Sequence, residues 1–313
     1  MHSIELSALD EPVVAVAGLT RRFGARTAVA DLSLSVSAGQ VAGLIGANGG
    51  GKTTSLRMLA GLLKPDAGTG RVLGHDLTLA DRSLRHDVGY MAQRLALYPS
   101  LSVVDNLRFR AEVYGVANAV QTARRVVTDY GLVPYANLPA ERLSGGWARL
   151  VQLAAALIHS PRLVLLDEPT AGLDATARQA VWQRIASLAG AGVAVVIATH
   201  DLAEAERCSH VSVLAGGRVR AQGAPLAIAQ SSVARVHALA GAAAIVLADR
   251  IAALPGVVAA YPAAGDLRVV TTGAAHDAVA DVARGAGCTI AAREPTLEDA
   301  TLVLAHQAPS AQP

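Results

Sequence analysis

The sequence predicts an α/β fold in which helices cover a mostly parallel sheet. Residues 163–166 and 193–198 are short apolar runs without polar alternation, which is typical of parallel strands buried on both faces. Residues 41–45 form another apolar run that ends in glycines, and Leu56 and Leu59 after it share one face of a predicted helix. Strands followed by helices in this order predict a parallel sheet.

An N-terminal antiparallel β-subdomain and a helical insertion are expected beside this sheet. Residues 32–37 alternate Leu-Ser-Leu-Ser-Val-Ser, so we expect an antiparallel strand with one exposed face. Ser102 and Asp105 have the spacing of a capping box. They begin a helical pattern that predicts an insertion over about residues 95–142.

The chain is expected to divide into a large domain of residues 1–226 and a small one of residues 241–313. Between them the charge thins into Ser231 and Ser232, so residues 227–240 are expected to be a linker. The small domain offers four strand candidates separated by two helical stretches, which predicts a β-α-β-β-α-β, ferredoxin-like α+β domain. The four candidates are residues 243–247, 257–261, 267–270 and 288–292.

Composition and charge exclude several classes of protein. Hydrophobic residues make up 52% of the 313 residues and charged residues 17%, which excludes a charge-rich disordered chain. The 27 basic and 25 acidic residues leave a net charge of +2, so nucleic acid is not expected as a partner. Cys208 and Cys288 are too few for a disulfide framework and favour a reducing, cytoplasmic setting.

No segment of the sequence is predicted to enter a membrane. A spanning helix needs about 20 mostly apolar residues, and the longest uncharged runs are too polar or too short. Residues 1–12 lack the basic start and apolar stretch of a signal peptide. If the protein works at a membrane, another chain is therefore expected to supply the membrane part.

Residues 46–53, Gly-Ala-Asn-Gly-Gly-Gly-Lys-Thr, match the phosphate-binding P-loop pattern between a predicted strand and a predicted helix. Glycines let successive N–H groups point into one concavity, and the helix N-terminus adds positive potential for an anion. Lys52 can reach the β- and γ-phosphates, and the Thr53 hydroxyl can ligate Mg²⁺. The flanking elements disfavour the other reading, a glycine-rich turn that only caps a helix. The expected ATP-binding residues here are Gly46, Asn48, Gly49, Gly51, Lys52, Thr53 and Thr54.

Asp167 and Glu168 follow the apolar run 163–166 and supply two adjacent carboxylates. Successive residues at a strand end point in different directions, so the two side chains can have different roles. We assign Asp167 to Mg²⁺ and Glu168 to general-base or water-polarising work on the attacking water. Such a pair is weak evidence alone and strong evidence beside a P-loop.

The tetrapeptide Leu143-Ser144-Gly145-Gly146, about twenty positions before Asp167, resembles the signature motif of ABC-type ATPases. A P-loop alone fits kinases, GTPases and helicases, whereas this combination resembles ABC nucleotide-binding domains from about residue 13 to residue 224. Trp147 stands where this family usually has glutamine, a variant associated with bacterial exporters of the ABC-2 type. Residues 294–299 are similar to the end of daunorubicin-resistance exporter ATPases.

Further positions match the family in order. Phe23 resembles the aromatic residue that stacks on adenine, although a core phenylalanine is an equally good reading without the family context. Gln93 resembles the Q-loop glutamine that senses Mg²⁺ and the γ-phosphate. Asp174 lies in a segment similar to the D-loop, and His200, in a Thr-His-Asp tripeptide directly after an apolar run, resembles the switch histidine.

The resemblance implies an ATPase whose site is completed by a second ATP-binding subunit, with a homodimer expected. Catalysis is then assigned to Glu168, His200 and Gln93. The residues implied for Mg²⁺, which accompanies ATP, are Thr53, Gln93 and Asp167. The residues expected to contact the ATP held by the other subunit are Ser144, Gly145, Gly146 and Asp174.

The implied function is the ATP-binding subunit of an ABC exporter, peripheral on the inner face of the cell membrane. ATP hydrolysis would power a separate integral-membrane permease, with drugs or other hydrophobic compounds as the expected cargo. The apolar segment 95–101, with Leu97, Tyr98 and Pro99, and the helical insertion are the expected permease contact.

Three other functions remain open at this point. A soluble ABC-type ATPase of translation or DNA repair usually carries two cassettes or long coiled-coil insertions, and this sequence has one P-loop and no heptad run. A P-loop small-molecule kinase would leave residues 143–146 and His200 without a role. The segment after about residue 226 could also make the chain a regulatory module in which ATPase activity is secondary.

Overall fold

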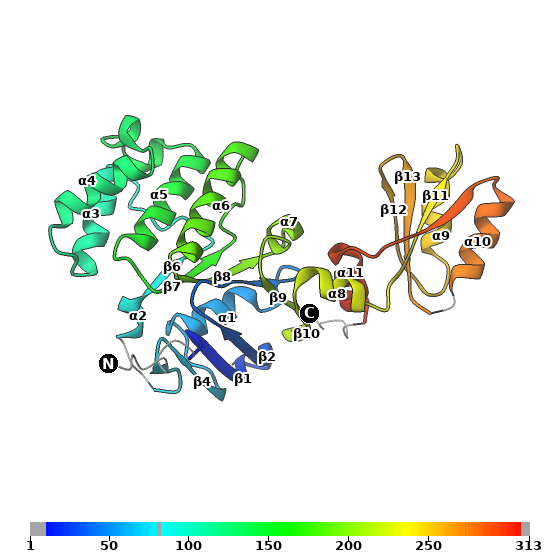
Figure 1. Cartoon of the computed structure of the whole chain (residues 1–313), viewed down its shortest axis with the longest axis horizontal. Coiled ribbons are helices and arrows are strands. Elements are labelled where there is room, and N and C mark those ends of the chain that lie inside the picture. Colours follow the sequence, from blue (N-terminus) through cyan, green and yellow to red (C-terminus); the bar gives the residue numbers. More distant parts are fainter. Residues whose placement is uncertain (1–10, 80–82, 274, 308–313) are drawn as a thin grey trace, which may run out of the picture.

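The computed structural model describes residues 11–79, 83–273 and 275–307. The elements in these ranges are organised around three β-sheets, two in the larger part of the molecule and one in a smaller part (Figure 1). The prediction that residues 1–12 are not a signal peptide falls mostly on residues 1–10, which lie outside the described residues. The last six residues of the expected small domain also lie outside them.

The central sheet has the strand order β10-β9-β3-β8-β7-β6, and neighbouring strands are parallel except in the β9–β10 hairpin. Its strands are β3 (Val41–Ile45), β6 (Val88–Met91), β7 (Leu163–Asp167), β8 (Ala194–Thr199), β9 (His210–Ala215) and β10 (Arg218–Gly223). Every residue of β7 and β8 is buried, because this sheet is covered on both faces. The predicted α/β class with a mostly parallel sheet is confirmed.

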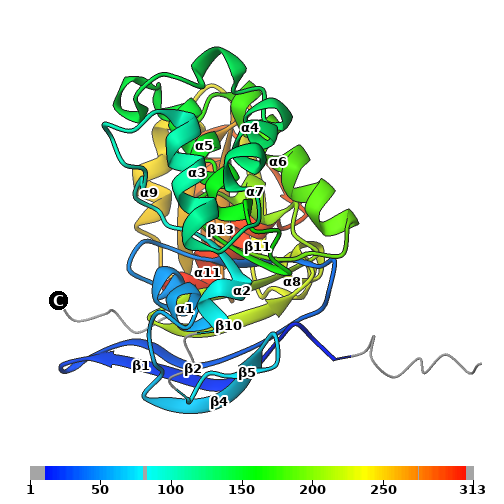
Figure 2. The same cartoon turned by 90° about the vertical axis from the view of Figure 1, so that its left-hand side faces the viewer.

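An antiparallel sheet of order β2-β1-β4-β5 covers one face of the central sheet, and helix α1 (Lys52–Leu59) lies between the two (Figure 2). Its strands are β1 (Val14–Phe23), β2 (Arg26–Val36), β4 (Ala67–Val72) and β5 (His75–Asp76). Residues 32–36 of β2 alternate between buried and exposed, which confirms the predicted antiparallel strand with one exposed face. Leu56, Met58 and Leu59 of α1 are fully buried in the shared core.

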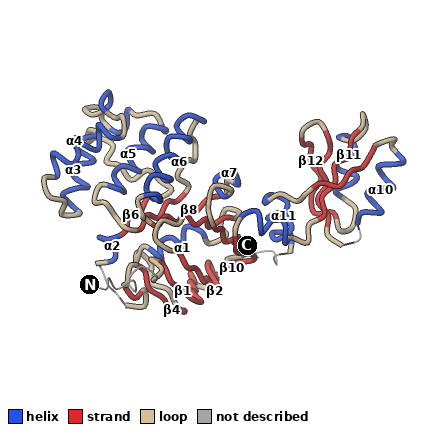
Figure 3. Tube along the Cα trace, in the orientation of Figure 1, coloured by secondary structure: helices blue, strands red, loops and turns tan. Residues whose placement is uncertain are grey.

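Helices cover the other face of the central sheet, and the helical insertion packs at one end of this layer (Figures 1 and 3). The helices of this region are α3 (Val103–Val113), α4 (Ala119–Asp129), α5 (Gly145–Leu157) and α6 (Ala175–Gly190), with 3₁₀ turns at Val133–Tyr135 and Ala140–Arg142. Short helices are α2 (Leu84–Asp87), α7 (Leu202–Ala205) and α8 (Pro225–Ser231). The Asp105 N–H donates to Ser102 Oγ at 3.1 Å, so the predicted start of α3 is confirmed.

The third sheet has the order β12-β13-β11-β14 and is antiparallel throughout. Its elements are β11 (Arg235–Ala240), α9 (Ala248–Ala252), β12 (Val257–Ala263), β13 (Asp266–Thr271), α10 (Ala275–Gly285) and β14 (Thr289–Arg293). This β-α-β-β-α-β sequence and strand order are those of the predicted ferredoxin-like α+β unit.

Two expectations about this region are wrong. Residues 243–247 do not form its first strand, because a helical turn follows Gly241 (φ 141°) and continues into the 3₁₀ helix Ile245–Leu247. The first strand is β11, which lies inside residues 227–240, the segment expected to be a linker. Because β11 pairs with a strand on each side, it is central in the sheet and cannot be a free connection.

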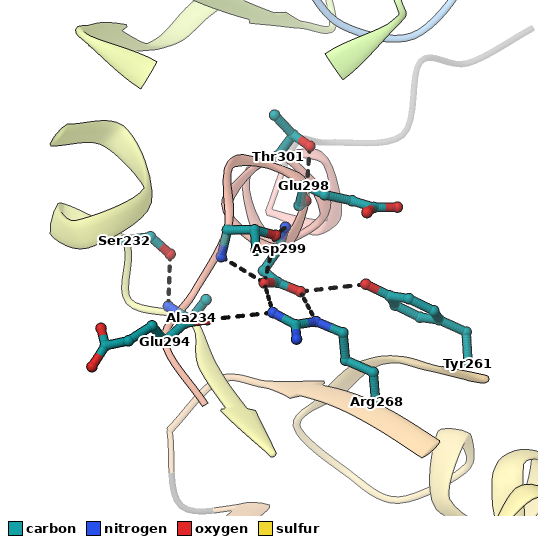
Figure 4. A network of polar contacts seen from close by, with 9 residues as sticks. Ser232, Ala234, Tyr261, Arg268, Glu294, Glu298, Asp299 and Thr301 are labelled. Atoms are coloured by element: carbon teal, nitrogen blue, oxygen red, sulfur yellow. Dashed lines mark hydrogen bonds and ion pairs between the residues drawn. The ribbon is translucent and has the colours of Figure 1, made fainter. Parts of the chain in front are cut away.

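Helix α11 (Leu297–His306) returns from the third sheet and packs on both parts of the molecule. Leu297 and Ala300 enter the core beside α8 and β9, whereas Val303 packs against β11 and β13. Figure 4 shows how the start of α11 is held: Arg268 of β13 binds Asp299 through two hydrogen bonds, Nη2 to Oδ2 at 2.5 Å and Nε to Oδ1 at 3.0 Å.

Asp299 also caps its own helix. Its Oδ2 accepts from the Thr296 N–H at 2.7 Å, and Thr296 Oγ1 accepts from the Asp299 N–H at 3.3 Å, which completes a capping box. Burial acts to raise the pKa of Asp299, but hydrogen bonds from Arg268 and Thr296 outweigh burial and hold the pKa below its ordinary value. The ionised carboxylate therefore stabilises the junction of α11 with the third sheet.

Asp299→Asn is expected to lower the free energy of unfolding by about 3 kcal/mol at neutral pH, because it leaves Arg268 without its charge partner. The pKa of Asp299 is lower in the folded chain than in the unfolded chain. The stabilisation is therefore present above the unfolded pKa of about 3.9 and is lost as the pH falls below it. Urea denaturation of both proteins at neutral pH and near pH 3 should show this difference shrink.

Asp281→Asn is the matched control, because it removes an exposed ion pair with Arg284 (2.6 Å) on α10. Exposed pairs contribute little, so this variant should unfold with the native protein. Equal effects of the two substitutions would contradict the role given to Asp299.

Candidate functional site

A cavity of about 550 Å³ opens where β3 and β7 end and α1 begins. It gathers side chains and backbone from five separate segments of the chain. The lining residues are Phe23, Arg26, Ala28, Asn48, Gly49, Gly51, Lys52, Thr53, Thr54, Gln93, Asp167 and Glu168. The structure thus brings together most of the residues expected to contact nucleotide or metal, and it adds Arg26 and Ala28 of β2, which were not expected.

The loop between β3 and α1 requires glycine at specific positions. Gly46 has φ 143°, and a Cβ there would lie 2.1 Å from the carbonyl oxygen of Leu214. Gly51 has φ 100°, and a Cβ there would lie 2.5 Å from the carbonyl oxygen of Ala28. Gly51 caps α1, and within the described residues no side chain caps this helix start, so its first N–H groups are available to an anion.

Lys52 is folded against this loop. Its Nζ donates to the carbonyl oxygens of Gly46 at 2.7 Å and Ala47 at 3.1 Å, and only 6% of the residue is exposed. Burial lowers the pKa of Lys52, while the nearby Glu168 and Asp167 carboxylates act to raise it. The ammonium group is therefore preplaced beside the cavity, and it makes hydrogen bonds that a phosphate oxygen can replace.

Asp167 is the feature that points to a cation. Neither carboxylate oxygen has a hydrogen-bond partner among the described residues, although the residue is only 1% exposed. Burial raises the pKa of Asp167, and the nearby Thr53 hydroxyl and Lys52 act to lower it. Mg²⁺ binds through one or two carboxylates, hydroxyl oxygens and its own water, so Asp167 and Thr53 fit this ion chemically. A hydrated cation would supply the partners that the buried carboxylate lacks.

Glu168, which lines the cavity, and His200, which is not among its lining residues, form a hydrogen-bonded pair, with Glu168 Oε1 2.8 Å from His200 Nδ1. Glu168 is 4% exposed, whereas the His200 side chain is 56% exposed. Glu168 also has a left-handed backbone conformation (φ 53°), fixed by a hydrogen bond from its N–H to the Ala198 carbonyl at 2.8 Å. Left-handed conformations of long side chains cost about 1–3 kcal/mol and gather at functional sites.

Phe23 lies at the rim of the cavity and is 50% exposed, so it is not a core phenylalanine. The Arg21 guanidinium lies 5.1 Å from its ring centroid. One face of an aromatic ring at this rim can stack on a planar base.

Ser144, Gly145, Gly146 and Asp174 are not among the described residues that line the cavity. Ser144 is the N-cap of α5, and Asp174 is the N-cap of α6, where its Oδ1 accepts from the Ala177 N–H at 2.8 Å. Ser144, Gly145 and Asp174 are exposed. The structure thus presents two helix N-termini at the surface of the subunit, away from its own cavity lining.

Sequence reasoning missed three buried polar residues behind the site. Arg149 and Gln152 of α5 bind the backbone near Gln93, and Arg149 also binds the backbone of Glu168. Glu204 of α7 accepts a hydrogen bond from Thr170, and burial raises its pKa. An arginine and a glutamine three positions apart on an otherwise apolar helix were the available signal for the first two.

Among the helices of the described residues, none has both the length and the apolar character needed to cross a membrane.

Residues 29–171 match the ABC transporter family. The probable multidrug ABC transporter ATP-binding protein YbhF of Escherichia coli (strain K12) is 39% identical over 231 residues, which make up 72% of this chain and 40% of that protein. The Nod factor export ATP-binding protein I of Ralstonia nicotianae is 40% identical over 221 residues, or 68% of each chain. The chain therefore spans 40% of the length of the E. coli relative and 68% of the length of the other.

Solved structures that match this chain are also ATP-binding cassettes of ABC transporters. The ATP-binding subunit of an ABC transporter matches with a TM-score of 0.63 and 30% identity, covering 69% of this chain and 91% of that chain. A dimeric ATP-binding cassette in a post-hydrolysis state, bound to ADP and Pi, matches with a TM-score of 0.62 and 25% identity, covering 67% of this chain and 98% of that chain. The resemblance inferred from the P-loop, the Ser144 turn (residues 143–146) and the Asp167–Glu168 pair is thus confirmed, and the chain belongs to the family of ABC transporter ATP-binding proteins.

Proposed function

We propose that this chain binds ATP with Mg²⁺ in the cavity and hydrolyses it. The observation that carries the proposal is the convergence, in one cavity, of a glycine loop, the buried Lys52, the Asp167 carboxylate, which has no hydrogen-bond partner among the described residues, and Glu168, which is paired with His200. The loop N–H groups and Lys52 bind the phosphates, and Phe23 stacks on the base. Asn48, Gly49 and Thr54 complete the cradle.

Thr53 and Asp167, with Gln93, would hold Mg²⁺, which when bound screens the phosphate charge. The Glu168 carboxylate accepts the proton of the attacking water as general base. An ionised carboxylate can only accept, so His200 with its proton on Nδ1 would donate to Glu168 Oε1, 2.8 Å away, and would fix the direction in which the carboxylate points.

A second ATP-binding subunit completes the site, and we propose a head-to-tail homodimer. Ser144, Gly145 and Asp174 are exposed and Gly146 is half-buried, and none of them lines its own cavity, which suits contact with ATP held by the other copy. Each of these segments begins a helix, whose N-terminus favours an anion. A solved cassette of this family is described as dimeric.

The permease contact is proposed at the apolar surface of the insertion. Leu95 is 52% exposed and Tyr98 50%, and the Tyr98 ring lies 4.9 Å from the Phe109 ring of α3 in an edge-to-face contact. Asn106 holds this segment, because its Oδ1 accepts from the Tyr98 N–H at 2.8 Å. An exposed aromatic surface of this kind fits a partner protein, here a separate integral-membrane permease that places the chain at the inner face of the cell membrane.

We infer that the permease exports drugs or other hydrophobic compounds, because relatives are named for multidrug transport and for Nod factor export. We also propose that residues 1–226 act as the ATP-binding domain. The ferredoxin-like unit, which begins at β11, acts as an accessory domain joined to it through α11.

The purified chain is expected to release phosphate from ATP when Mg²⁺ is the only other addition, and EDTA should abolish this release. A small-molecule kinase needs an acceptor for turnover, so phosphate release without an acceptor separates the two activities. Turnover that appears only with an added acceptor, or no turnover at all, would overturn the proposed ATPase.

A further inference from the structure

Arg149 of α5 is a buried cation that joins two segments of the site. It is 5% exposed, and its Nη1 donates to the Gln93 carbonyl at 2.6 Å. Its Nη2 donates to the Glu168 carbonyl at 2.6 Å. Longer contacts reach the preceding carbonyl on each side, Ala92 and Asp167, both at 3.4 Å. One planar guanidinium therefore connects the backbone of the Q-loop glutamine to the backbone of the general base.

Gln152, one turn further along α5, holds the same Q-loop segment. Its Nε2 donates to the carbonyls of Ala92 at 3.0 Å and Arg94 at 2.9 Å, the two residues that flank Gln93. Its Oε1 accepts from Arg149 Nη1 at 3.2 Å. Three consecutive carbonyls of the Q-loop are thus bound by two side chains of one helix.

The bonds of Arg149 depend on the shape of its side chain. Within the described residues Arg149 forms no ion pair, and all its acceptors are backbone carbonyls except Gln152 Oε1. Burial lowers the pKa of Arg149, whereas Asp167, Glu168 and Glu204 act to raise it. Removing the guanidinium from water is therefore unfavourable, and the nearby carboxylates offset part of this penalty. A guanidinium can reach two chain segments with a rigid fork of donors, and an ammonium group of similar charge cannot.

The helix that carries Arg149 also carries Ser144 as its N-cap, little more than one turn away. We propose that Arg149 is a positioning residue that, with Gln152, holds Gln93, Glu168 and the Ser144 turn in one fixed arrangement. This proposal rests on the proposed ATPase activity. Because the contacts act on the backbone of Gln93 and Glu168, their loss leaves both side chains present but displaced. A displacement of about 1 Å at reacting groups can cost about 100-fold in rate.

The test compares Arg149→Gln, Arg149→Lys and Gln152→Leu with the native chain in Mg²⁺-dependent ATP hydrolysis. We expect kcat to fall about 10- to 100-fold in both Arg149 variants, with KM for ATP changed less than about threefold, because no nucleotide-contacting group is removed. Arg149→Lys keeps the charge and loses the bridge, so a loss as large as that of Arg149→Gln supports the geometric role. Gln152→Leu should show the same pattern with a smaller fall in kcat.

Arg184→Met is the matched control. Arg184 is a half-buried arginine of α6 that is not among the cavity lining residues; it donates to the Tyr130 hydroxyl at 3.0 Å and its guanidinium lies 4.3 Å from that ring's centroid. Its loss should lower the melting temperature without lowering kcat. Circular dichroism melts of all variants separate a loss of folded protein from a loss of rate per folded molecule.

Native kcat in all three variants, or kcat losses that merely follow their melting temperatures as in Arg184→Met, would overturn the proposal. Native activity in Arg149→Lys alone would also overturn it, because charge and not the bridge would then suffice. If Arg149→Gln does not fold, Arg149→Lys and Gln152→Leu still decide the question. A native chain that releases no phosphate contradicts the proposed function instead, so the two failures are distinguishable.

Discussion

Glu168→Gln is expected to bind ATP, to hydrolyse it at least about 100-fold more slowly than the native chain, and to accumulate as an ATP-held dimer. Removal of a general base costs about 100- to 10,000-fold in rate. Binding should persist, because the glycine loop and Lys52 are unchanged and glutamine has the shape of the lost side chain. ATP that is not hydrolysed continues to join the two subunits.

Gel filtration with ATP and Mg²⁺ measures the dimer, which should elute at twice the mass of the 31.9 kDa chain. Phosphate release measures the rate, and Glu112→Gln, an exposed carboxylate on α3, is the control that should remain at native values for both. A Glu168→Gln protein that stays monomeric with ATP would remove the support for a site shared between two copies. A near-native rate of phosphate release in Glu168→Gln would show that Glu168 is not the general base.

Much of this site could be predicted from sequence because its parts are contiguous. Residues 46–53 form the loop and are also the residues proposed to bind the phosphates, so the spacing of glycine and lysine in the sequence predicts the geometry of the loop. The Asp167–Glu168 pair was visible for the same reason, since it ends a strand whose apolar pattern marks it as buried. His200 followed from its resemblance to the switch histidine together with its place after another such strand, and the structure joins it to Glu168.

The contacts of Arg149 could not be predicted in this way. The polar side chains at 149 and 152 stand out on an apolar helix, but their partners are at residues 92–94 and 167–168. These partners are backbone carbonyl groups, which every residue type has, so the sequence does not mark them. The position of strand β11 could not be predicted for a similar reason. Residues 243–247 have the stronger apolar, β-branched composition, and only pairing with β13 and β14 identifies residues 235–240 as the strand.

Lys52→Ala is expected to weaken ATP binding by at least about 100-fold, the effect of losing about two charge-assisted hydrogen bonds to phosphate at 1.5–3 kcal/mol each. The chain contains only one other lysine, Lys64, so Lys64→Ala is a control of the same chemistry at an exposed position after α1. Titration with a fluorescent ATP analogue should show native affinity for the Lys64 variant alone.

The folded state of the Lys52 variant should persist, which separates lost binding from lost structure. Burial lowers the pKa of Lys52, which means that the folded chain disfavours the charged ammonium group. Alanine removes this unfavourable burial of charge and also removes the two hydrogen bonds to Gly46 and Ala47, so the two effects oppose each other. Urea denaturation without nucleotide should therefore give nearly equal midpoints for the native chain and both lysine variants. Unchanged ATP affinity in a well-folded Lys52→Ala protein would show that the phosphates do not lie in this loop, and every role proposed for the cavity would then need to be reassigned.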